Sequence, residues 1–176
     1  MNIVHNEIEI LKELKRIEDR INLENNEEVN TTVKKILEDV KNKGDEALKK
    51  YTFKFDGFDP EPLSVSKKEI EKAWETTTKP LQEALINAKH RIEKFHEQEI
   101  PKSFSIKGVY GEDVQRKWLP VQRAGIYVPG GRASYPSTVL MNAIPAKVAG
   151  VKEIIMVSPA NAQGEMNKTV LAAAHI

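Results

Sequence analysis

The stretch between Val121 and Ala160 restricts the fold of this chain more than any other feature, because most of its positions are apolar. It predicts four elements in order: a buried strand at 124–128, a Pro-Gly-Gly turn at 129–131, an apolar helix from Ser137 and a second strand at 153–158. Strands without polar alternation, joined by a helix, are typical of parallel sheets that are buried on both faces. The sequence therefore predicts an α/β fold.

Charge density falls sharply after Ser105. The first 105 residues carry 22 acidic and 19 basic side chains, whereas the remaining 71 carry 4 and 8. Seven of the nine glycines also lie in the second part. We therefore divide the chain into a helical segment, residues 1–105, and an α/β segment, residues 106–176.

Local signals predict the elements of both segments. Apolar spacing predicts helices at 10–21 and 29–40. A short helix is expected after Gly44, with Asp45 as its cap and the Asp56-Gly57 turn at its end. Two further helices are expected, one that Ser66 caps and one that runs from Pro80 to about Glu99. Short extended pieces between Ser103 and Pro120 predict a hairpin, and a closing helix is expected from near Gly164.

Composition excludes several classes of protein. The chain has no cysteine, which removes disulfides, thiolate catalysis and thiolate zinc sites and favours a reducing compartment. Its net charge of +1 argues against binding to nucleic acid or to an anionic membrane. The N-terminus has neither a secretory signal nor a membrane span, so we expect a cytoplasmic protein.

The C-terminus suggests truncation. The run LAAAHI stops without a capping glycine or a following strand. Two parallel strands also make a small sheet to stand alone. We therefore expect a longer parent protein.

The Pro129-Gly130-Gly131 turn is the candidate ligand site that spacing alone suggests. It joins a buried strand to a helix, where backbone N–H groups can face an anion. It matches neither the G-x-G-x-x-G fingerprint nor a phosphate loop. A ligand site and a plain crossover turn both remain open.

Histidine and tryptophan spacing gives no second site. His90 and His96 lie about 240° apart around a helix, so they cannot share a metal. His96 and Glu99 can face each other, but the second histidine of H-E-x-x-H is missing, so a solvated or locally paired histidine is favoured over a metal ligand. Trp74 and Trp118 are interpreted as packing residues.

Three blocks of sequence carry a family resemblance: KGDEALKKYTFKFDG at 43–57, FHEQ at 95–98 and GIYVPGGRASYPSTVLMNAIPAKVAGVKEIIMVSP at 125–159. Together they resemble the N-terminal portion of histidinol dehydrogenase. The resemblance implies an aldehyde-dehydrogenase-like α/β fold that is truncated here, and a homodimer with intertwined subunits. It also implies an enzyme that uses zinc and NAD to oxidise L-histidinol through the aldehyde to L-histidine.

The resemblance also assigns residues. Phe55, Tyr127 and Pro129 fall on NAD contacts of the family, and Gly130 and Gly131 complete that cofactor-binding turn. Ser137 falls on a position near the substrate and is also the predicted helix N-cap. The zinc ligands and the catalytic Glu-His pair are expected beyond Ile176, so no catalytic or metal-binding residue is assigned in this chain.

Three hypotheses stand at this point. The chain is an N-terminal piece of a histidinol dehydrogenase that is inactive alone, a small nucleotide-binding module that a partner completes, or a helical interaction protein with an α/β scaffold. All three predict a chain without dehydrogenase activity of its own.

Overall fold

The computed structural model of the chain describes residues 6–21, 27–130, 134–161 and 163–176. Its contacts separate two compact units, Met1–Tyr51 and Thr52–Ile176. The composition change after Ser105 falls within the second unit. Within the described residues, no helix has the length and apolar composition needed to cross a membrane.

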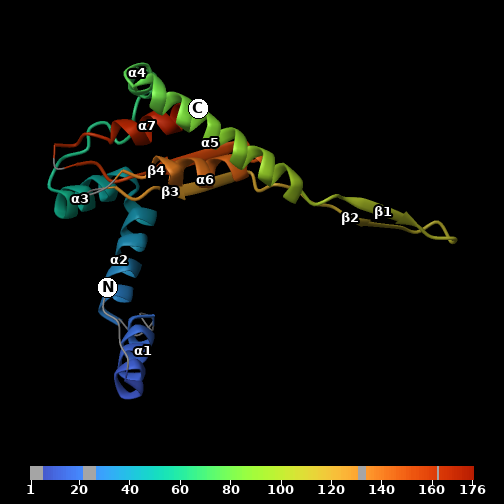
Figure 1. Cartoon of the computed structure of the whole chain (residues 1–176), viewed down its shortest axis with the longest axis horizontal. Coiled ribbons are helices and arrows are strands. Elements are labelled where there is room, and N and C mark those ends of the chain that lie inside the picture. The colour runs from blue at the N-terminus through green and yellow to red at the C-terminus, as the bar shows by residue number, and fades with distance from the viewer. Residues whose placement is uncertain (1–5, 22–26, 131–133, 162) are drawn as a thin grey trace. The chain divides into compact units, whose positions relative to one another are not determined.

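The first unit is helical, as predicted, and holds α1 (Glu7–Ile21), α2 (Glu27–Lys43) and the beginning of α3 (Asp45–Asp56) (Figure 1). Gly44 ends α2 because it adopts a left-handed φ of 55°, which favours glycine. Asp45 is the first residue of α3 and not its cap, so that detail of the prediction was wrong. The Tyr51 hydroxyl donates to Oδ2 of Asp39 at 2.6 Å and so links α3 to α2.

Two helices of the second unit begin where local signals predicted. Ser66 Oγ accepts from the Glu69 amide at 3.2 Å, and the Glu69 carboxylate accepts from the Ser66 amide at 3.4 Å. This capping box opens α4 (Lys67–Glu75). Pro80 lies in the first turn of α5 (Lys79–His96), which runs into a 3-10 turn, η2 (Glu97–Glu99).

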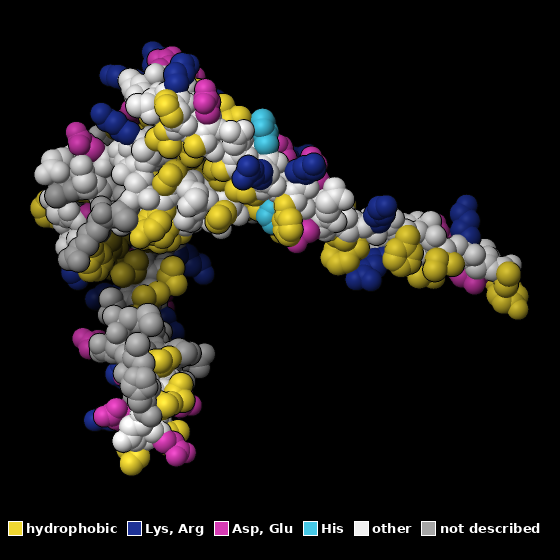
Figure 2. All heavy atoms as spheres, in the orientation of Figure 1, with side chains coloured by type: hydrophobic (Ala, Val, Ile, Leu, Met, Phe, Trp, Pro, Cys, Tyr) yellow, Lys and Arg dark blue, Asp and Glu magenta, His cyan; other side chains and the backbone are white. Residues whose placement is uncertain are grey.

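The predicted hairpin is confirmed as β1 (Phe104–Lys107) and β2 (Asp113–Arg116), which pair in antiparallel register with Ile106 opposite Val114. The two strands extend away from the rest of the second unit (Figure 1). Opposite residues share a face, so Phe104, Ile106 and Val114 form one mainly apolar face, which Arg116 shares, and the three apolar side chains are exposed (Figure 2). Trp118 is also largely exposed, with the Arg116 guanidinium 4.7 Å from its ring, so it is not a core residue.

The parallel pair is also confirmed. β3 (Arg123–Tyr127) and β4 (Glu153–Val157) pair with Gly125 opposite Ile155, and α6 (Pro136–Val148) lies on the connection between them. The expectation that both faces of the sheet are buried was wrong. Alternate residues of each strand, among them Ile155, are exposed, because α6 covers one face and the other is open in the described part of this unit.

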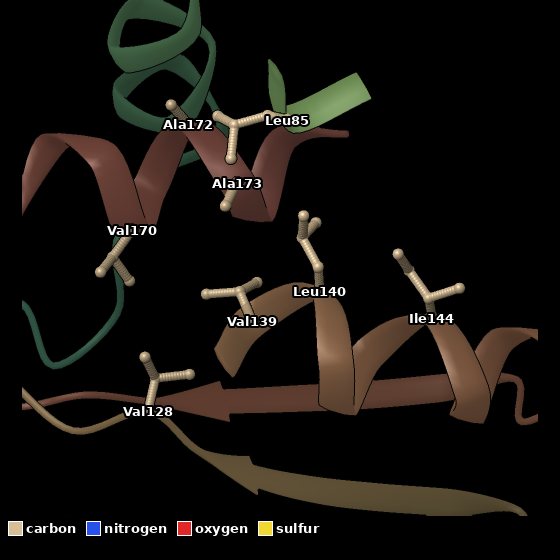
Figure 3. Close-up of a cluster of buried hydrophobic side chains, with 8 residues drawn as sticks. All are labelled: Leu85, Val128, Val139, Leu140, Ile144, Val170, Ala172 and Ala173. Carbon is tan, nitrogen blue, oxygen red and sulfur yellow. The ribbon is translucent and has the colours of Figure 1, made fainter. Parts of the chain in front are cut away.

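The core lies between that covered face and three helices. Its buried side chains come from α5, α6, α7 (Lys168–His175) and the residue directly after β3, and are Leu85, Val128, Val139, Leu140, Ile144, Val170, Ala172 and Ala173 (Figure 3). Trp74 packs against this cluster, as predicted, and stacks on His175.

The last helix begins later than predicted. Gly164 has a φ of 76° and its amide donates to the Asn161 carbonyl at 2.9 Å, so it closes a turn and does not open a helix. α7 begins at Lys168 because Asn167 caps it: Oδ1 accepts from the amides of Thr169 and Val170 at 3.0 and 3.3 Å.

Candidate functional site

The candidate site lies at the carboxyl edge of the β3–β4 sheet, where ligands of open parallel sheets bind. Two loops leave this edge, and their described residues are 128–130 and 134–135 after β3, and 158–161 and 163–167 after β4. The Val128 amide donates to the Val157 carbonyl at 2.9 Å, so strand pairing continues to the start of both loops. Val128 is fully buried, which anchors the first loop in the core.

Tyr127 is the last residue of β3 and is 63% exposed. This confirms the predicted position at the carboxyl end of the strand, with open surroundings. The alternative of a buried core tyrosine is excluded by the same exposure. An aromatic ring held at the end of a rigid strand can lie against a planar ligand group.

Gly130 lies where the two loops touch. A β-carbon at this residue would be 2.9 Å from the Pro159 carbonyl oxygen and 3.2 Å from Pro159 Cδ. Glycine therefore allows the two loops to pack closely at this position. The sequence had offered only a ligand site or a plain crossover turn. Gly131 and Arg132 lie outside the described residues.

Ser137 is exposed in the first turn of α6, but it does not cap the helix. The cap position is Tyr135, which makes no side-chain capping bond, and Pro136 is the first helical residue. The predicted capping role was wrong because Pro136 fits the first helical position, so the cap lies two residues earlier, at Tyr135.

Phe55 lies in the last turn of α3, is 58% exposed, and has the Lys54 ammonium 5.2 Å from its ring centre. The residues that follow it approach the loop after β4. There, Gly164 packs so closely on Phe58 that a β-carbon would lie 3.1 Å from the Phe58 ring.

A pocket of about 480 Å³ lies between these two segments. Its walls include Asp56, Phe58, Asp59, Pro159 and Gly164, and its described lining carries four carboxylates without a Lys or Arg. Carboxylates accept hydrogen bonds from hydroxyl groups and repel phosphate. The sequence analysis did not select Pro159. The rule that ligands bind at the carboxyl ends of parallel strands selected Tyr127 after β3, and it applies equally to the residues after β4.

Comparison with known proteins gives three concordant results. Residues 20–176 match the sequence model of the family described as Histidinol dehydrogenase. The chain is 59% identical over all of its 176 residues to a histidinol dehydrogenase of Prochlorococcus marinus (strain MIT 9312), and 48% identical over 152 residues to that of Agrobacterium fabrum (strain C58 / ATCC 33970). The chain belongs to the histidinol dehydrogenase family.

The fold agrees with that of a solved family member. The crystal structure of histidinol dehydrogenase from Elizabethkingia anophelis superposes on 83% of this chain with a TM-score of 0.77 and 37% sequence identity. That match covers 34% of the crystallised chain, and the Prochlorococcus and Agrobacterium matches cover 40% and 35% of those proteins. The chain thus spans about 40% or less of the length of these family members.

The histidine that the sequence left as solvated or locally paired is paired. Nδ1 of His96 contacts Oε2 of Glu99. In the part of the chain that the structure describes, no group of three or more histidine, aspartate or glutamate side chains could hold a metal ion.

Proposed function

We propose that this chain is the N-terminal part of a histidinol dehydrogenase, which oxidises L-histidinol through the aldehyde to L-histidine with two NAD. The observation that carries the proposal is the 59% identity to a histidinol dehydrogenase over the whole chain. We further propose a cytoplasmic location and a homodimer. The exposed apolar face of the β1–β2 hairpin supports self-association.

In this proposal the carboxyl edge of the sheet is the NAD-binding surface. Tyr127 and Pro129 form an apolar wall at the end of β3, and Gly130 keeps that wall close to the loop after β4. Bound NAD supplies the hydride acceptor for the oxidation. The open ring of Tyr127 supports a stacking role for that residue, and Gly131 completes the same turn in the sequence.

Phe55 and Ser137 have supporting roles in the proposal. Phe55 is an exposed aromatic residue in the last turn of α3, so its ring suits a stacking contact with the cofactor. Ser137 is an exposed hydroxyl in the first turn of α6, so it can donate to a substrate or accept from it.

Zinc and the Glu-His acid-base pair are assigned to portions of the whole enzyme that these 176 residues do not include. We therefore expect the isolated chain to lack histidinol-dependent NAD reduction even when zinc is supplied, because in this proposal the zinc ligands, the acid and the base belong to the rest of the enzyme.

A chimera tests this proposal. The corresponding 40% of the Prochlorococcus marinus (strain MIT 9312) protein is replaced by this chain, and histidinol-dependent NAD reduction is measured with zinc present. We expect activity from the chimera and none from the 176-residue chain. A folded chimera without activity, beside an active parent, would overturn the proposal.

A further inference from the structure

β4 has one paired edge and one open edge. It pairs with β3, and no strand lies on its other side in the described part of the chain. The Val128 amide, directly after β3, donates to the Val157 carbonyl at 2.9 Å. Backbone groups of successive residues point to alternate sides of a strand, so those of Ile155 and Val157 face β3, whereas those of Ile154 and Met156 face the open edge.

A pocket of about 740 Å³ follows this open edge. Five consecutive residues, 154–158, line it, although their side chains alternate between the two faces of the sheet. Consecutive residues share only the edge of a strand, so the pocket runs along the backbone of β4 and not over one face. The segment before α4, together with α6 and α7, supplies further apolar lining, including Leu63, Ala143 and Leu171.

The open edge lacks the usual protection of a sheet edge. A row of unpaired N–H and C=O groups pairs readily with another strand, and native proteins cover such an edge or break it with charges or proline. The central residues of β4, Ile154, Ile155 and Met156, are all apolar, and the strand contains no proline. An extended segment fits this place, because it adds hydrogen bonds along the edge and apolar side chains in the pocket.

The position of α7 indicates which segment that is. Val139 of α6 and Val170 of α7 are buried with Val128 in one core, so both helices lie on the same side of the two strands (Figure 3). Crossovers between parallel strands are right-handed with few exceptions. Two right-handed crossovers over one face advance in the same direction across the sheet. The strand that follows α7 therefore lies beyond β4, on the side away from β3, which is the open edge.

We propose that the open edge of β4 is the docking site for a parallel strand from the part of the enzyme that follows α7. This inference rests on the function proposed above, in which these 176 residues are the N-terminal part of a longer enzyme. The Prochlorococcus marinus (strain MIT 9312) relative has the required length, because the match covers 40% of it. The added strand accepts from the Ile154 and Met156 amides and donates to their carbonyls, and its side chains fill the 740 Å³ pocket.

Residue-resolved amide hydrogen exchange tests the docking site in two proteins, the isolated chain and the chimera described above. In the isolated chain, the amides of Ile154 and Met156 are expected to exchange fast. In the chimera, both should slow by about 100-fold or more, because a paired strand opens only together with a larger unit. The amides of Ile155 and Val157 are the internal control, since they face β3 and should exchange slowly in both proteins.

A proline variant gives a second readout. Met156→Pro removes an amide that faces the open edge, and Met156→Ala is the matched control, because it shortens the same side chain and keeps the amide. The urea midpoints of the two variants are compared in both proteins. We expect the gap between the midpoints to be larger in the chimera than in the isolated chain, where the amide has no strand to bind.

The outcomes separate this inference from the proposed function, which the activity of the chimera tests. Fast exchange at Ile154 and Met156 in a folded, active chimera overturns the docking site alone, and so does an unchanged proline gap. A folded, inactive chimera that protects both amides overturns the proposed function and supports the docking site. Slow exchange of both amides in the isolated chain overturns the docking site, and slowing that grows with protein concentration identifies a second copy as the occupant.

Discussion

Gly130 and Pro159 follow two parallel strands and touch so closely that a β-carbon on Gly130 would lie 2.9 Å from the Pro159 carbonyl oxygen. Real β-carbons do not approach a backbone oxygen at that distance, so only glycine fits without movement. The contact sets the separation of the two loops at the carboxyl edge of the sheet. It therefore also sets the shape of the proposed cofactor wall.

Gly130→Ala is expected to destabilise the chain by about 1–3 kcal/mol, the usual cost of adding a methyl group to a packed site. Gly125→Ala is the control, since a β-carbon there meets nothing within 4 Å and its φ is not left-handed. The free energy of unfolding of the control variant should lie within about 0.5 kcal/mol of the wild-type value. Urea denaturation of both variants measures the difference, and equal midpoints would show that the loops separate without cost.

Tyr127→Ala is expected to weaken NAD binding by about 1–3 kcal/mol, as for other stacking aromatics. Its effect on stability should be small because the side chain is 63% exposed. Tyr110→Ala, at a residue 94% exposed near the hairpin tip, is the matched control and should change neither quantity. Calorimetric affinity and the urea midpoint separate the two roles: a large midpoint drop with unchanged affinity contradicts the cofactor role.

Leu140→Ala is expected to lower the free energy of unfolding by about 2–5 kcal/mol, because it opens a cavity among buried side chains. Leu140 is 3% exposed and lies in the core, whereas Leu119 is 82% exposed. The same substitution at Leu119 should leave the free energy of unfolding within about 0.5 kcal/mol of wild type. Thermal and urea unfolding measure both variants, and similar losses at the two positions would contradict the core described above.

The Asp39–Tyr51 hydrogen bond predicts a pH dependence of the first unit. The Tyr51 hydroxyl lowers the pKa of Asp39, and the same bond raises the pKa of Tyr51. A lowered carboxyl pKa means that the stabilisation is complete above about pH 4, the ordinary aspartate value, and is lost as pH falls through the pKa of the folded state. On the Tyr51 side, stabilisation is present below about pH 10 and is lost as pH rises through the raised pKa.

Tyr51→Phe is expected to raise the pKa of Asp39 toward its ordinary value. NMR titration of the Asp39 carboxyl carbon measures this change directly. Tyr110→Phe removes a hydroxyl from the second unit and serves as the control, with no change at Asp39. An unchanged titration in Tyr51→Phe would show that the hydrogen bond does not persist in solution.

The hairpin predicts self-association of the chain. Ile106→Asp places a charge on its apolar face, and Ser105→Asp places the same charge on the opposite face of β1. Light scattering over a range of concentrations should show weaker association for Ile106→Asp than for Ser105→Asp. A wild-type chain that stays monomeric throughout that range contradicts the prediction.

The sequence by itself determined most of the local structure. Gly44, Ser66 and Pro80 mark helix boundaries through backbone conformation and capping, which depend on residues only a few positions away. The apolar block also predicted the parallel pairing of β3 and β4, and with it the place of Tyr127 at the carboxyl edge. These features follow from short-range rules and from the tendency of strand-helix-strand units to form parallel sheets with ligand sites at the carboxyl ends of the strands.

The tertiary structure alone decided the contacts between distant segments. The role of Gly130 depends on Pro159, and the Ser134 hydroxyl donates to Oδ1 of Asn167, which lies 33 residues further along the chain. The exposure of one face of the β3–β4 sheet depends on which elements pack against it. The start of α7 was predicted too early because Asn167 caps the helix, whereas Gly164 closes a turn that precedes it. Each of these features depends on a contact between residues that are distant in the sequence and that folding brings together. A local sequence pattern does not contain the distance between such residues.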